Sequence, residues 1–423
     1  MATASTRGKH VLAGVAVFTA LACRKHVWAA ALAALASLGP AQAGVTVLYA
    51  FKGGSDGDTP SAVIEDSAGY LNGTTCDGGY NDYGTVFRIA PDGSKTIHYS
   101  FDGFDGACPL AGLIADKAGN LYGTTFEGGS TGCEGYGCGT VFKLTPNGEH
   151  TVLHTFTGED GDGSYPQAAL IEDEAGNLYG TTNGGGADFG TVFEITAGGS
   201  ETVLYAFKFG HDGAYPQASL LRDRAGNLYG TTPEGGENYR CMGYWGSGCG
   251  TVFKITPNGA EKTLYAFRDR RRKGVSPLAG LIKDRAGNFY GTTVIGGSGC
   301  LKPVCGTVFE LASDGSEKDL YDFRGQEHND GADPNDGVIR DKAGKLYGTT
   351  YNDGANGNFG TIFELAPDGT ETVLYSFAGG KDGRWPEAGL IRDKAGNFYG
   401  STSAGGGATA CQDGCGTVFR LTK

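Results

Sequence analysis

One motif pair recurs seven times along this chain, and it limits the possible folds more than any other feature. Each copy has a Leu/Phe-Tyr-Gly-Thr-Thr run, a Gly-rich gap and a Gly-Thr-Val-Phe run, with single substitutions in three copies. The copies lie 50 to 61 residues apart and begin at Gly73, Gly123, Gly180, Gly230, Gly291, Gly348 and Gly400. Repeats of this length, made of short β-rich runs and turns, are typical of propeller blades.

Residues 111–156 contain one complete unit. Four strands are expected in it, at 111–116, 121–125, 139–145 and 151–156. An Ala-Gly-Asn turn joins the first two strands, and a Pro-Asn-Gly turn joins the last two. The longer Gly-rich gap separates the second strand from the third. Four antiparallel strands of this length make one blade.

The two ends of the mature chain predict how the ring closes. Residues 45–51 have the sequence of a fourth strand, and the chain ends with a third strand at 416–422. We therefore expect an all-β, seven-bladed propeller of four-stranded antiparallel blades, closed by the N-terminal strand completing the last blade. Closure removes the open sheet edges that promote aggregation. Residues 44–423 are expected to form this single domain.

Residues 1–43 have the features of a signal peptide. Basic residues precede an apolar run, a second apolar run follows at 27–38, and Ala41-Gln42-Ala43 is a small-residue cleavage site. The double run leaves open an internal translation start, a retained anchor or a lipoprotein signal at Cys23. After cleavage we expect no transmembrane domain and a secreted, periplasmic or surface-exposed bacterial protein.

The charge of the mature chain excludes some partners. Residues 1–43 contain four Lys/Arg and no Asp/Glu, so the remainder has a net charge of −17. Such a surface repels duplex nucleic acid and anionic membranes. We therefore expect no nucleic-acid partner, and we expect a monomer.

The cysteines predict disulfides. Ten remain after signal cleavage, an even number in an exported chain. Four pairs each fall within one Gly-rich gap: Cys133/Cys138, Cys241/Cys249, Cys300/Cys305 and Cys411/Cys415. Cys76 and Cys108 remain, in adjacent repeats. Zinc binding is the alternative, but these spacings come without nearby His.

Loop lengths indicate where binding is expected. The step from each Gly-Thr-Thr to the next Gly-Thr-Val-Phe varies from 10 to 20 residues, whereas the step back varies only from 39 to 42. Variable loops on one face of a rigid scaffold usually carry binding. Aromatic residues that precede a Pro should surround the channel mouth on this face; these are Tyr165, Tyr215 and Trp385. They could stack on sugars or simply pack on the adjacent Pro.

Two further loops contain candidate ligand-binding residues. The longest gap holds Tyr239, Arg240, Tyr244 and Trp245 between its two cysteines, and it could bind a partner or pack on itself. One connection between repeats is basic where the others carry Asp-Gly, and it includes Arg270, Arg271 and Arg272. This basic run could bind phosphate, sulfate or a uronate, or be a solvated loop.

Alternating carboxylates raise the possibility of Ca²⁺. The pairs are Asp56 with Asp58 and Asp160 with Asp162. Short loops with alternating Asp suit a hard cation, although Asp-Gly is also an ordinary turn sequence. We predict no other cofactor and no catalytic residues, because the chain contains no nucleophile elbow and no metal-spaced His pair.

The repeat resembles a known family. The sequence Asp-x-Ala-Gly-Asn-Leu-Tyr-Gly-Thr-Thr, followed by Gly-Thr-Val-Phe-Lys-Leu-Thr-Pro, is similar to the GloVer tandem repeat of exported bacterial proteins, a family described by a choice of C-terminal anchors. The similarity covers essentially residues 45–423, and the first unit departs from it at Tyr70 and Asn72. It implies secretion or surface display but no activity. An anchoring tail is missing, so we expect a released or periplasmic protein.

Three functions stay open. The first is a non-catalytic binding module that recognises a glycan or a surface protein through its loop-rich face. The second is a carbohydrate-active lyase or hydrolase, which would need carboxylates with raised pKa values at the channel mouth. The third is a structural extracellular protein, which a mouth plugged by Tyr165, Tyr215 and Trp385 would favour.

Overall fold

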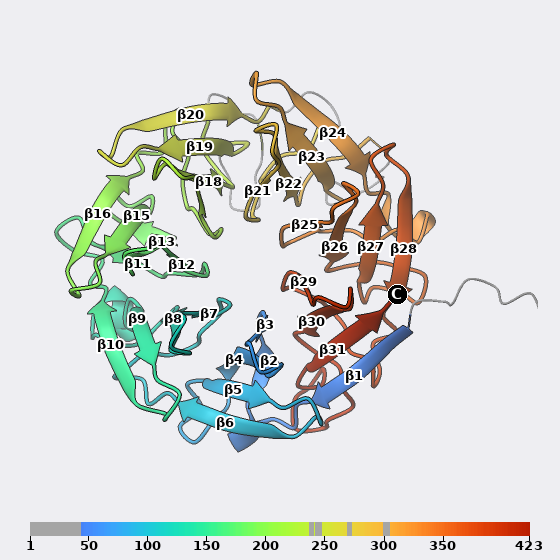
Figure 1. The fold of residues 1–423 in the computed structure, drawn as a ribbon, viewed down its shortest axis with the longest axis horizontal. Helices are drawn as coiled ribbons and strands as arrows, with labels where there is room; N and C mark the ends of the chain where they lie inside the picture. The colour runs from blue at the N-terminus through green and yellow to red at the C-terminus, as the bar shows by residue number, and fades with distance from the viewer. Residues whose placement is uncertain (1–43, 237–240, 242–247, 269–272, 299–304) are drawn as a thin grey trace, which may run out of the picture. The chain divides into compact units, whose positions relative to one another are not determined.

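The computed structural model describes residues 44–423, apart from 237–240, 242–247, 269–272 and 299–304. The described residues form seven four-stranded antiparallel blades arranged in a ring (Figure 1). Within each blade, the strand order along the chain is also the order from the channel outward, except in the last blade. This confirms the predicted all-β, seven-bladed propeller.

Each blade begins with a two-residue inner strand at the channel and ends with a longer outer strand. From the channel outward, blade one has β3 (Ile64–Glu65), β4 (Leu71–Asp77), β5 (Thr85–Ile89) and β6 (Lys95–Ser100); blade two has β7 (Ile114–Ala115), β8 (Leu121–Thr125), β9 (Thr140–Leu144) and β10 (His150–Thr155); blade three has β12 (Ile171–Glu172), β13 (Leu178–Thr182), β15 (Thr191–Ile195) and β16 (Glu201–Ala206). Blade four has β17 (Leu221–Arg222), β18 (Leu228–Thr232), β19 (Thr251–Ile255) and β20 (Glu261–Ala266); blade five has β21 (Ile282–Lys283), β22 (Phe289–Thr293), β23 (Thr307–Leu311) and β24 (Glu317–Asp322). Blade six has β25 (Ile339–Arg340), β26 (Leu346–Thr350), β27 (Thr361–Leu365) and β28 (Glu371–Ser376); blade seven has β29 (Ile391–Arg392), β30 (Phe398–Thr402), β31 (Thr417–Thr422) and β1 (Gly44–Ala50).

The ring is closed as the sequence predicted. The N-terminal strand β1 pairs antiparallel with β31, and Val45 lies opposite Leu421. Blade seven therefore takes its outer strand from the start of the chain, as Figure 1 shows where the two ends of the colour range meet. A hydrogen bond from Ser401 Oγ to the Ser61 carbonyl (2.8 Å) joins blade seven to blade one.

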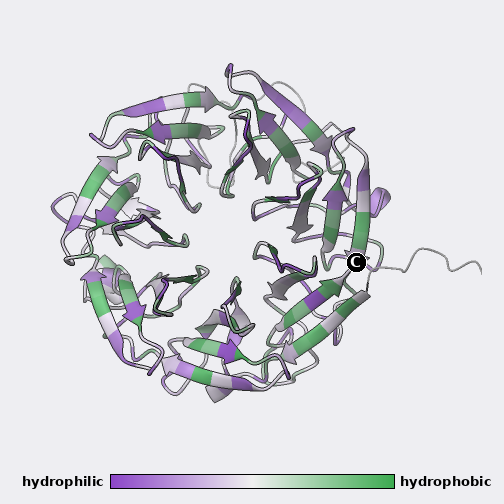
Figure 2. Cartoon of the chain, in the orientation of Figure 1, coloured by the Kyte–Doolittle hydropathy of each residue, from purple (hydrophilic) through white to green (hydrophobic). Residues whose placement is uncertain are grey.

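A repeated pair of phenylalanines forms the core between blades. The Phe after each outer strand is buried and meets the Phe of the next Gly-Thr-Val-Phe edge to face, with ring centroids 5.1 to 5.3 Å apart. Phe51, next to β1, makes this contact with Phe87 of blade one. Hydrophobic residues alternate with polar ones along the strands (Figure 2). The buried apolar residues thus form seven clusters, one at each junction between neighbouring blades, which no single blade could bury alone.

The threonines of the motif connect strands and blades. The hydroxyl of the first Thr of Gly-Thr-Thr, replaced by Ser401 in blade seven, bonds to a carbonyl shortly before the inner strand of the next blade. The second Thr bonds to the Thr of Gly-Thr-Val-Phe in its own blade, with oxygens 2.8 to 2.9 Å apart. These bonds satisfy buried hydroxyls and explain why every unit carries the same residues.

The inner strands are shorter than predicted. The unit at 111–156 was expected to begin with a six-residue strand, but β7 contains only Ile114–Ala115. The residues before it contact the neighbouring blade instead: the Ala111 carbonyl accepts a hydrogen bond from Thr74 Oγ1 of blade one (3.1 Å). Inter-blade bonding therefore replaces ladder pairing at the channel.

Short elements and disulfides complete the described chain. The elements are β2 (Asp58–Pro60), β11 (Gly163–Ser164), β14 (Gly184–Gly185) and the 3₁₀ turns η1 (Gly54–Asp56), η2 (Cys133–Gly135) and η3 (Gly325–Glu327). Disulfides join Cys76–Cys108, Cys133–Cys138, Cys241–Cys249 and Cys411–Cys415, as predicted. Cys305 is also disulfide-bonded, and its predicted partner Cys300 lies outside the described residues. Within the described chain, no helix has the length and apolarity needed to span a membrane.

Candidate functional site

The central channel holds a cavity of about 600 Å³ to which all seven blades contribute. Its lining comes from the residues that follow each inner-strand Pro, and it includes a belt of small residues: Ala62, Gly112, Ala169, Ser219, Gly280, Gly337 and Gly389. Neighbouring blades approach closely here, since a Cβ on Gly337 would lie 2.8 Å from the Gly280 carbonyl oxygen. A cavity of this volume is large enough for a small ligand.

The rim of this cavity is conformationally strained in the same way in every blade. The residue before each inner-strand Pro adopts a left-handed backbone with φ of 48 to 60°, at Thr59, Cys108, Tyr165, Tyr215, Ser276, Asp333 and Trp385. This conformation is unfavourable for any residue with a Cβ. Backbone hydrogen bonds enforce it: the Trp385 N–H donates to the Phe359 carbonyl of blade six, and the Trp385 carbonyl accepts from Ser403. The side chains of the rim are therefore held in fixed directions.

Each aromatic residue of the rim has a partner in a neighbouring loop. Tyr165 packs on Phe126 with ring centroids 5.0 Å apart, and Tyr215 lies 5.9 Å from Phe189. No ring contact joins Tyr165, Tyr215 and Trp385 to one another in the part of the chain that the structure describes. Within the described residues, each of the three rings thus packs on a ring of its own neighbouring loop and not on the other two.

Trp385 makes three kinds of contact with its neighbours. Its ring stacks on Tyr351 at 5.9 Å, its indole N–H donates to the Asn358 carbonyl (3.0 Å), and the Arg384 guanidinium lies 4.4 Å from its ring centroid. Trp385 remains half-buried. Tyr351 also hydrogen-bonds to Glu387, which lines the channel two residues after Trp385. The contacts therefore run from the rim into the cavity.

Two carboxylates line the cavity in this sector. Asp336 of blade six accepts hydrogen bonds from the backbone N–H groups of Gly337 (2.5 Å) and of Gly389 in blade seven, two residues beyond Glu387. Asp336 is half-buried and Glu387 is exposed to the channel. The protein packed around the channel raises the pKa of Asp336, although its two backbone hydrogen bonds oppose the shift. It also raises the pKa of Glu387, against the effect of the Tyr351 hydrogen bond. Both carboxylates face the channel, so a ligand there could contact them.

Sequence analysis missed this acidic sector, although the sequence carries a signal for it. Asp336 occupies the second position after the inner-strand Pro, where the other six blades have Ala62, Ala111, Ala168, Ala218, Ala279 and Ala388. Glu387 is the acidic residue at the first such position, where the others have Ser, Leu, Gln or Asn. A departure from a repeat consensus at a channel-facing position indicates a special role.

Several predicted binding residues cannot be placed in this site. Tyr239, Arg240, Tyr244 and Trp245, together with Arg270, Arg271 and Arg272, lie outside the described residues. Lys273, which follows the basic run, pairs with Glu317 (3.3 Å) and Asp319 (3.1 Å) on the outer strand of blade five.

The predicted Ca²⁺ ligands are only partly brought together. Asp56 accepts hydrogen bonds from the Tyr49 hydroxyl, the Lys52 N–H and the Lys95 ammonium, at 2.8 to 2.9 Å. Asp58 instead pairs across strands with Asp77. Asp160 is exposed, whereas Asp162 bonds to Thr157 and His154. Ca²⁺ binding at these positions stays a prediction.

Comparison with protein families identifies the family of the repeat. A family model described as the Gloeobacter/Verrucomicrobia repeat matches residues 31–245 and 241–423. The chain belongs to this repeat family. The resemblance expected from the motif is thereby confirmed. The search of curated proteins returned no match to the chain.

Several solved structures are similar to this repeat-family protein at low sequence identity. The extracellular domain of a B. thetaiotaomicron protein, named as a one component system, matches with 12% identity and a TM-score of 0.55, over 88% of this chain and 39% of that one. A Xanthomonas campestris gluconolactonase matches with 12% identity and a TM-score of 0.43, over 90% and 89%. PQQ-bound aldose sugar dehydrogenase from Streptomyces coelicolor matches with 12% identity and a TM-score of 0.43, over 90% of this chain and 98% of that one. The chain spans well under half of the first protein, and this similarity shows a shared fold alone.

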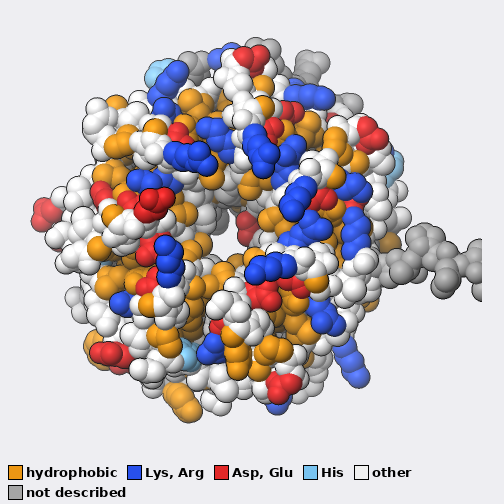
Figure 3. All heavy atoms as spheres, viewed as in Figure 1, with side chains coloured by type: hydrophobic (Ala, Val, Ile, Leu, Met, Phe, Trp, Pro, Cys, Tyr) orange, Lys and Arg blue, Asp and Glu red, His pale blue; other side chains and the backbone are white. Residues whose placement is uncertain are grey.

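The Ala-Gly-Asn turns give this repeat protein an uneven charge. Exposed cations flank these turns in blades four to seven, at Arg222, Arg224, Lys283, Arg285, Arg340, Lys342, Arg392 and Lys394. Figure 3 shows Lys and Arg side chains gathered around the central opening. These turns lie at the opposite end of the inner strands from Trp385. The cations at this channel opening are therefore concentrated in blades four to seven, whereas the cavity contains Asp336 and Glu387.

A buried glutamate should make stability depend on pH. Burial, with the neighbouring Asp330 adding to its effect and Arg324 opposing it, raises the pKa of Glu371 to about 7 from an ordinary value of 4.5. The folded state then binds more protons than the unfolded state between these pH values. The contribution of Glu371 to the free energy of unfolding is therefore fully present below pH 4.5 and is lost as pH rises through 7. In Glu371→Gln, the free energy of unfolding should fall by about 1 to 2 kcal/mol less over this pH range than in the wild type, after allowance for solvent screening.

Urea unfolding at pH 5 and pH 8 tests this expectation. Exposed Glu174, on an Ala-Gly-Asn turn, supplies the matched control Glu174→Gln, which should keep the wild-type pH dependence. An equal loss of stability between the two pH values in Glu371→Gln and in the wild type would show that Glu371 is not responsible.

Proposed function

We propose that this chain is an exported propeller that binds a glycan at the mouth of its central channel, in the sector formed by blades six and seven. The observation that carries the proposal is the continuous run of contacts from Trp385 through Tyr351 to Glu387, beside Asp336 in the cavity. Aromatic faces suit the apolar faces of sugars, and carboxylates accept hydrogen bonds from sugar hydroxyls.

The chemistry of this sector favours one class of sugar. Asp336 and Glu387 would repel uronates and sulfated sugars, so the ligand is a neutral or amino sugar. The rim is held by backbone hydrogen bonds, which reduces the entropy lost on binding. The disulfides support an extracytoplasmic location, where such glycans occur, and we propose that the protein acts as a monomer.

A glycan-array screen of the mature protein, followed by calorimetry on any hit, tests the proposal. Glu387→Gln should weaken binding about 10- to 100-fold, since hydrogen bonds to a charged group contribute about 1.5–3 kcal/mol. Glu174→Gln on the opposite face should bind like the wild type. Binding that survives both Glu387→Gln and Asp336→Asn, or an array without a hit, would contradict the proposal.

The acidic pair also favours a second candidate, a glycoside-cleaving enzyme. General acid catalysis needs a carboxyl group that is protonated near neutral pH, and the pKa values of Asp336 and Glu387 are both raised by the protein around the channel. Incubating an array hit with the protein and analysing the products by mass spectrometry distinguishes the two functions. Cleavage abolished by Asp336→Asn, with binding retained, would establish the enzyme, whereas an intact glycan would leave the binding module.

A further inference from the structure

Consecutive blades also meet through a polar cluster on the outside of the ring, between their outer strands. At most junctions its members are a Tyr on one outer strand, the Asp of the following Asp-Gly turn and the first residue of the next outer strand, whereas Tyr265 bonds directly to Glu317. Between blades three and four, for example, Tyr205 donates to Asp212 (2.8 Å), and Glu261 lies close enough to raise the pKa of Tyr205. The Tyr recurs as Tyr49, Tyr99, Tyr205, Tyr265, Tyr321 and Tyr375.

The cluster between blades two and three departs from this pattern. His154 of β10 takes the place of the Tyr, opposite Asp162 of the turn and Glu201, the first residue of β16. One ligand atom from each of these three side chains lies within 4.8 Å of the other two. Figure 1 shows that β10 and β16 are the outer strands of neighbouring blades. A nitrogen and two carboxylate oxygens are thus brought together from two blades.

The His154–Asp162 distance is too long for a strong charge-assisted bond and suits a shared cation. His154 Nε2 and Asp162 Oδ1 are 3.3 Å apart, whereas a charge-assisted N–H···O bond is about 2.7–2.9 Å long. Zinc bonds of about 2.0–2.2 Å in tetrahedral geometry place neighbouring ligand atoms about 3.3–3.6 Å apart. The observed 3.3 Å between His154 Nε2 and Asp162 Oδ1 agrees with two ligand atoms of one tetrahedral zinc ion.

Glu201 has a carboxylate oxygen available to a ligand. Its Oε1 atom is buried and has no hydrogen-bond partner among the described residues, a feature shared by the equivalent Glu317 and Glu371, so His154 is what distinguishes this cluster. An unpartnered buried carboxylate oxygen beside a second carboxylate is costly, and a divalent cation between them would remove that cost.

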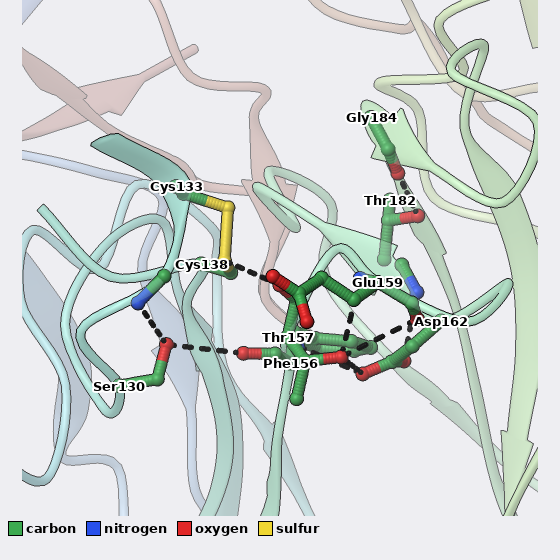
Figure 4. Close-up of a disulfide and its surroundings, with 11 residues drawn as sticks. Ser130, Cys133, Cys138, Phe156, Thr157, Glu159, Asp162, Thr182 and Gly184 are labelled. Atoms are coloured by element: carbon green, nitrogen blue, oxygen red, sulfur yellow. Dashed lines mark hydrogen bonds between the residues drawn. A yellow bond between two sulfur atoms is a disulfide. The ribbon is translucent and has the colours of Figure 1, made fainter. Parts of the chain in front are cut away.

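Asp162 is held in place for such a role. Its Oδ2 accepts hydrogen bonds from the Thr157 N–H (2.8 Å) and hydroxyl (3.0 Å). The Thr157 carbonyl in turn lies 3.1 Å from Cys138 Sγ of the Cys133–Cys138 disulfide. Figure 4 shows this run from the disulfide through Thr157 to Asp162. Outer partners of this kind orient metal ligands.

We propose that His154, Asp162 and Glu201 bind one divalent transition-metal ion of the Zn²⁺ class and that this ion clamps blade two to blade three. Imidazole with carboxylates suits Zn²⁺ better than Ca²⁺, which prefers an all-oxygen set of six or more ligands. Three protein ligands leave one position of a tetrahedral ion for water or for another group. This site is separate from the channel and from the proposed glycan.

The test uses tag-free mature protein, stripped with chelator and titrated with Zn²⁺ by calorimetry, with Co²⁺ absorption as a second readout. One Zn²⁺ should bind per chain and raise the melting temperature. Glu201→Gln and His154→Tyr should each weaken binding about 100-fold or more, since loss of outer partners alone costs 10- to 100-fold. The exposed His328 supplies the control His328→Gln, which should bind Zn²⁺ like the wild type.

His154→Tyr also separates metal binding from folding. It restores the residue that the other six clusters carry, so its melting temperature without metal should match that of the chelator-treated wild type. Zn²⁺ should no longer raise it. The proposal is overturned if the wild type binds no stoichiometric Zn²⁺, or if His154→Tyr and Glu201→Gln bind it with wild-type affinity.

Discussion

Deletion of residues 44–51 should abolish cooperative unfolding and leave a protein that aggregates. These residues supply β1 and Phe51, which is fully buried against Phe87 of blade one. Truncating one buried Phe to Ala costs about 3–5 kcal/mol, a large part of the 5–15 kcal/mol that stabilises a typical domain. The deletion also exposes the edge of β31, an unpaired strand of the kind that recruits other chains. Size-exclusion chromatography and calorimetric melting measure both effects.

A circular permutant is the matched control for this deletion. Val45 lies opposite Leu421 as His150 lies opposite Leu144 in blade two, where Thr-Pro-Asn-Gly-Glu joins the strands. A chain that starts at Gly54 and joins Thr422 to Gly44 through Pro-Asn-Gly therefore has the geometry of a normal blade hairpin. It should be monomeric and melt cooperatively. Failure of the permutant, or cooperative melting of the deletion variant, would show that β1 is not what closes the ring.

Gly360→Ala should destabilise the protein by about 2–5 kcal/mol. Gly360 has a φ of +87°, which costs an L-residue about 1–2 kcal/mol. A Cβ there would also lie 2.3 Å from the Thr350 carbonyl oxygen and 2.6 Å from Pro386 Cδ of blade seven. These are backbone and ring atoms, so relief requires a shift between the blades, and overpacking of this kind costs about 1–3 kcal/mol more.

Gly199→Ala separates the two contributions. Gly199 has nearly the same φ, +86°, but it is exposed and has no atom within 4 Å of the added Cβ. It should lose only the 1–2 kcal/mol of the left-handed backbone. Denaturant unfolding of both variants gives the difference, and equal losses would rule out a steric contact between blades. Because Pro386 follows Trp385, we also expect Gly360→Ala to weaken glycan binding while Gly199→Ala does not.

The overall architecture could be predicted because each of the seven repeats contains the residues that form the same contacts. Each Gly-Thr-Thr forms bonds both within its blade and to the next blade, and each outer-strand Phe meets the next Gly-Thr-Val-Phe. A pattern with one physical role in every copy is visible in the sequence without knowledge of the fold. The order of strand types at the two ends was then enough to predict the closure of blade seven.

The sites could not be predicted in the same way, because they depend on residues that differ between copies. Asp336 and Glu387 are 51 positions apart, and only the packing of blade seven beside blade six brings them into one part of the channel. His154, Asp162 and Glu201 meet only because the start of one outer strand lies beside the end of the preceding one. Sequence spacing favoured the pair Asp160 and Asp162, but the turn directs Asp162 toward His154.

The number of blades, the motif roles, the disulfide pairs that the structure describes and the way the ring closes could all be predicted from the repeat. These features rest on local patterns and on contacts between consecutive units, which a fixed period repeats. The length of the inner strands, the partners of Tyr165, Tyr215 and Trp385, and the carboxylates that share the channel became visible in the folded ring. Those features arise where unlike residues from different blades meet, and the curvature of the closed ring sets their distances.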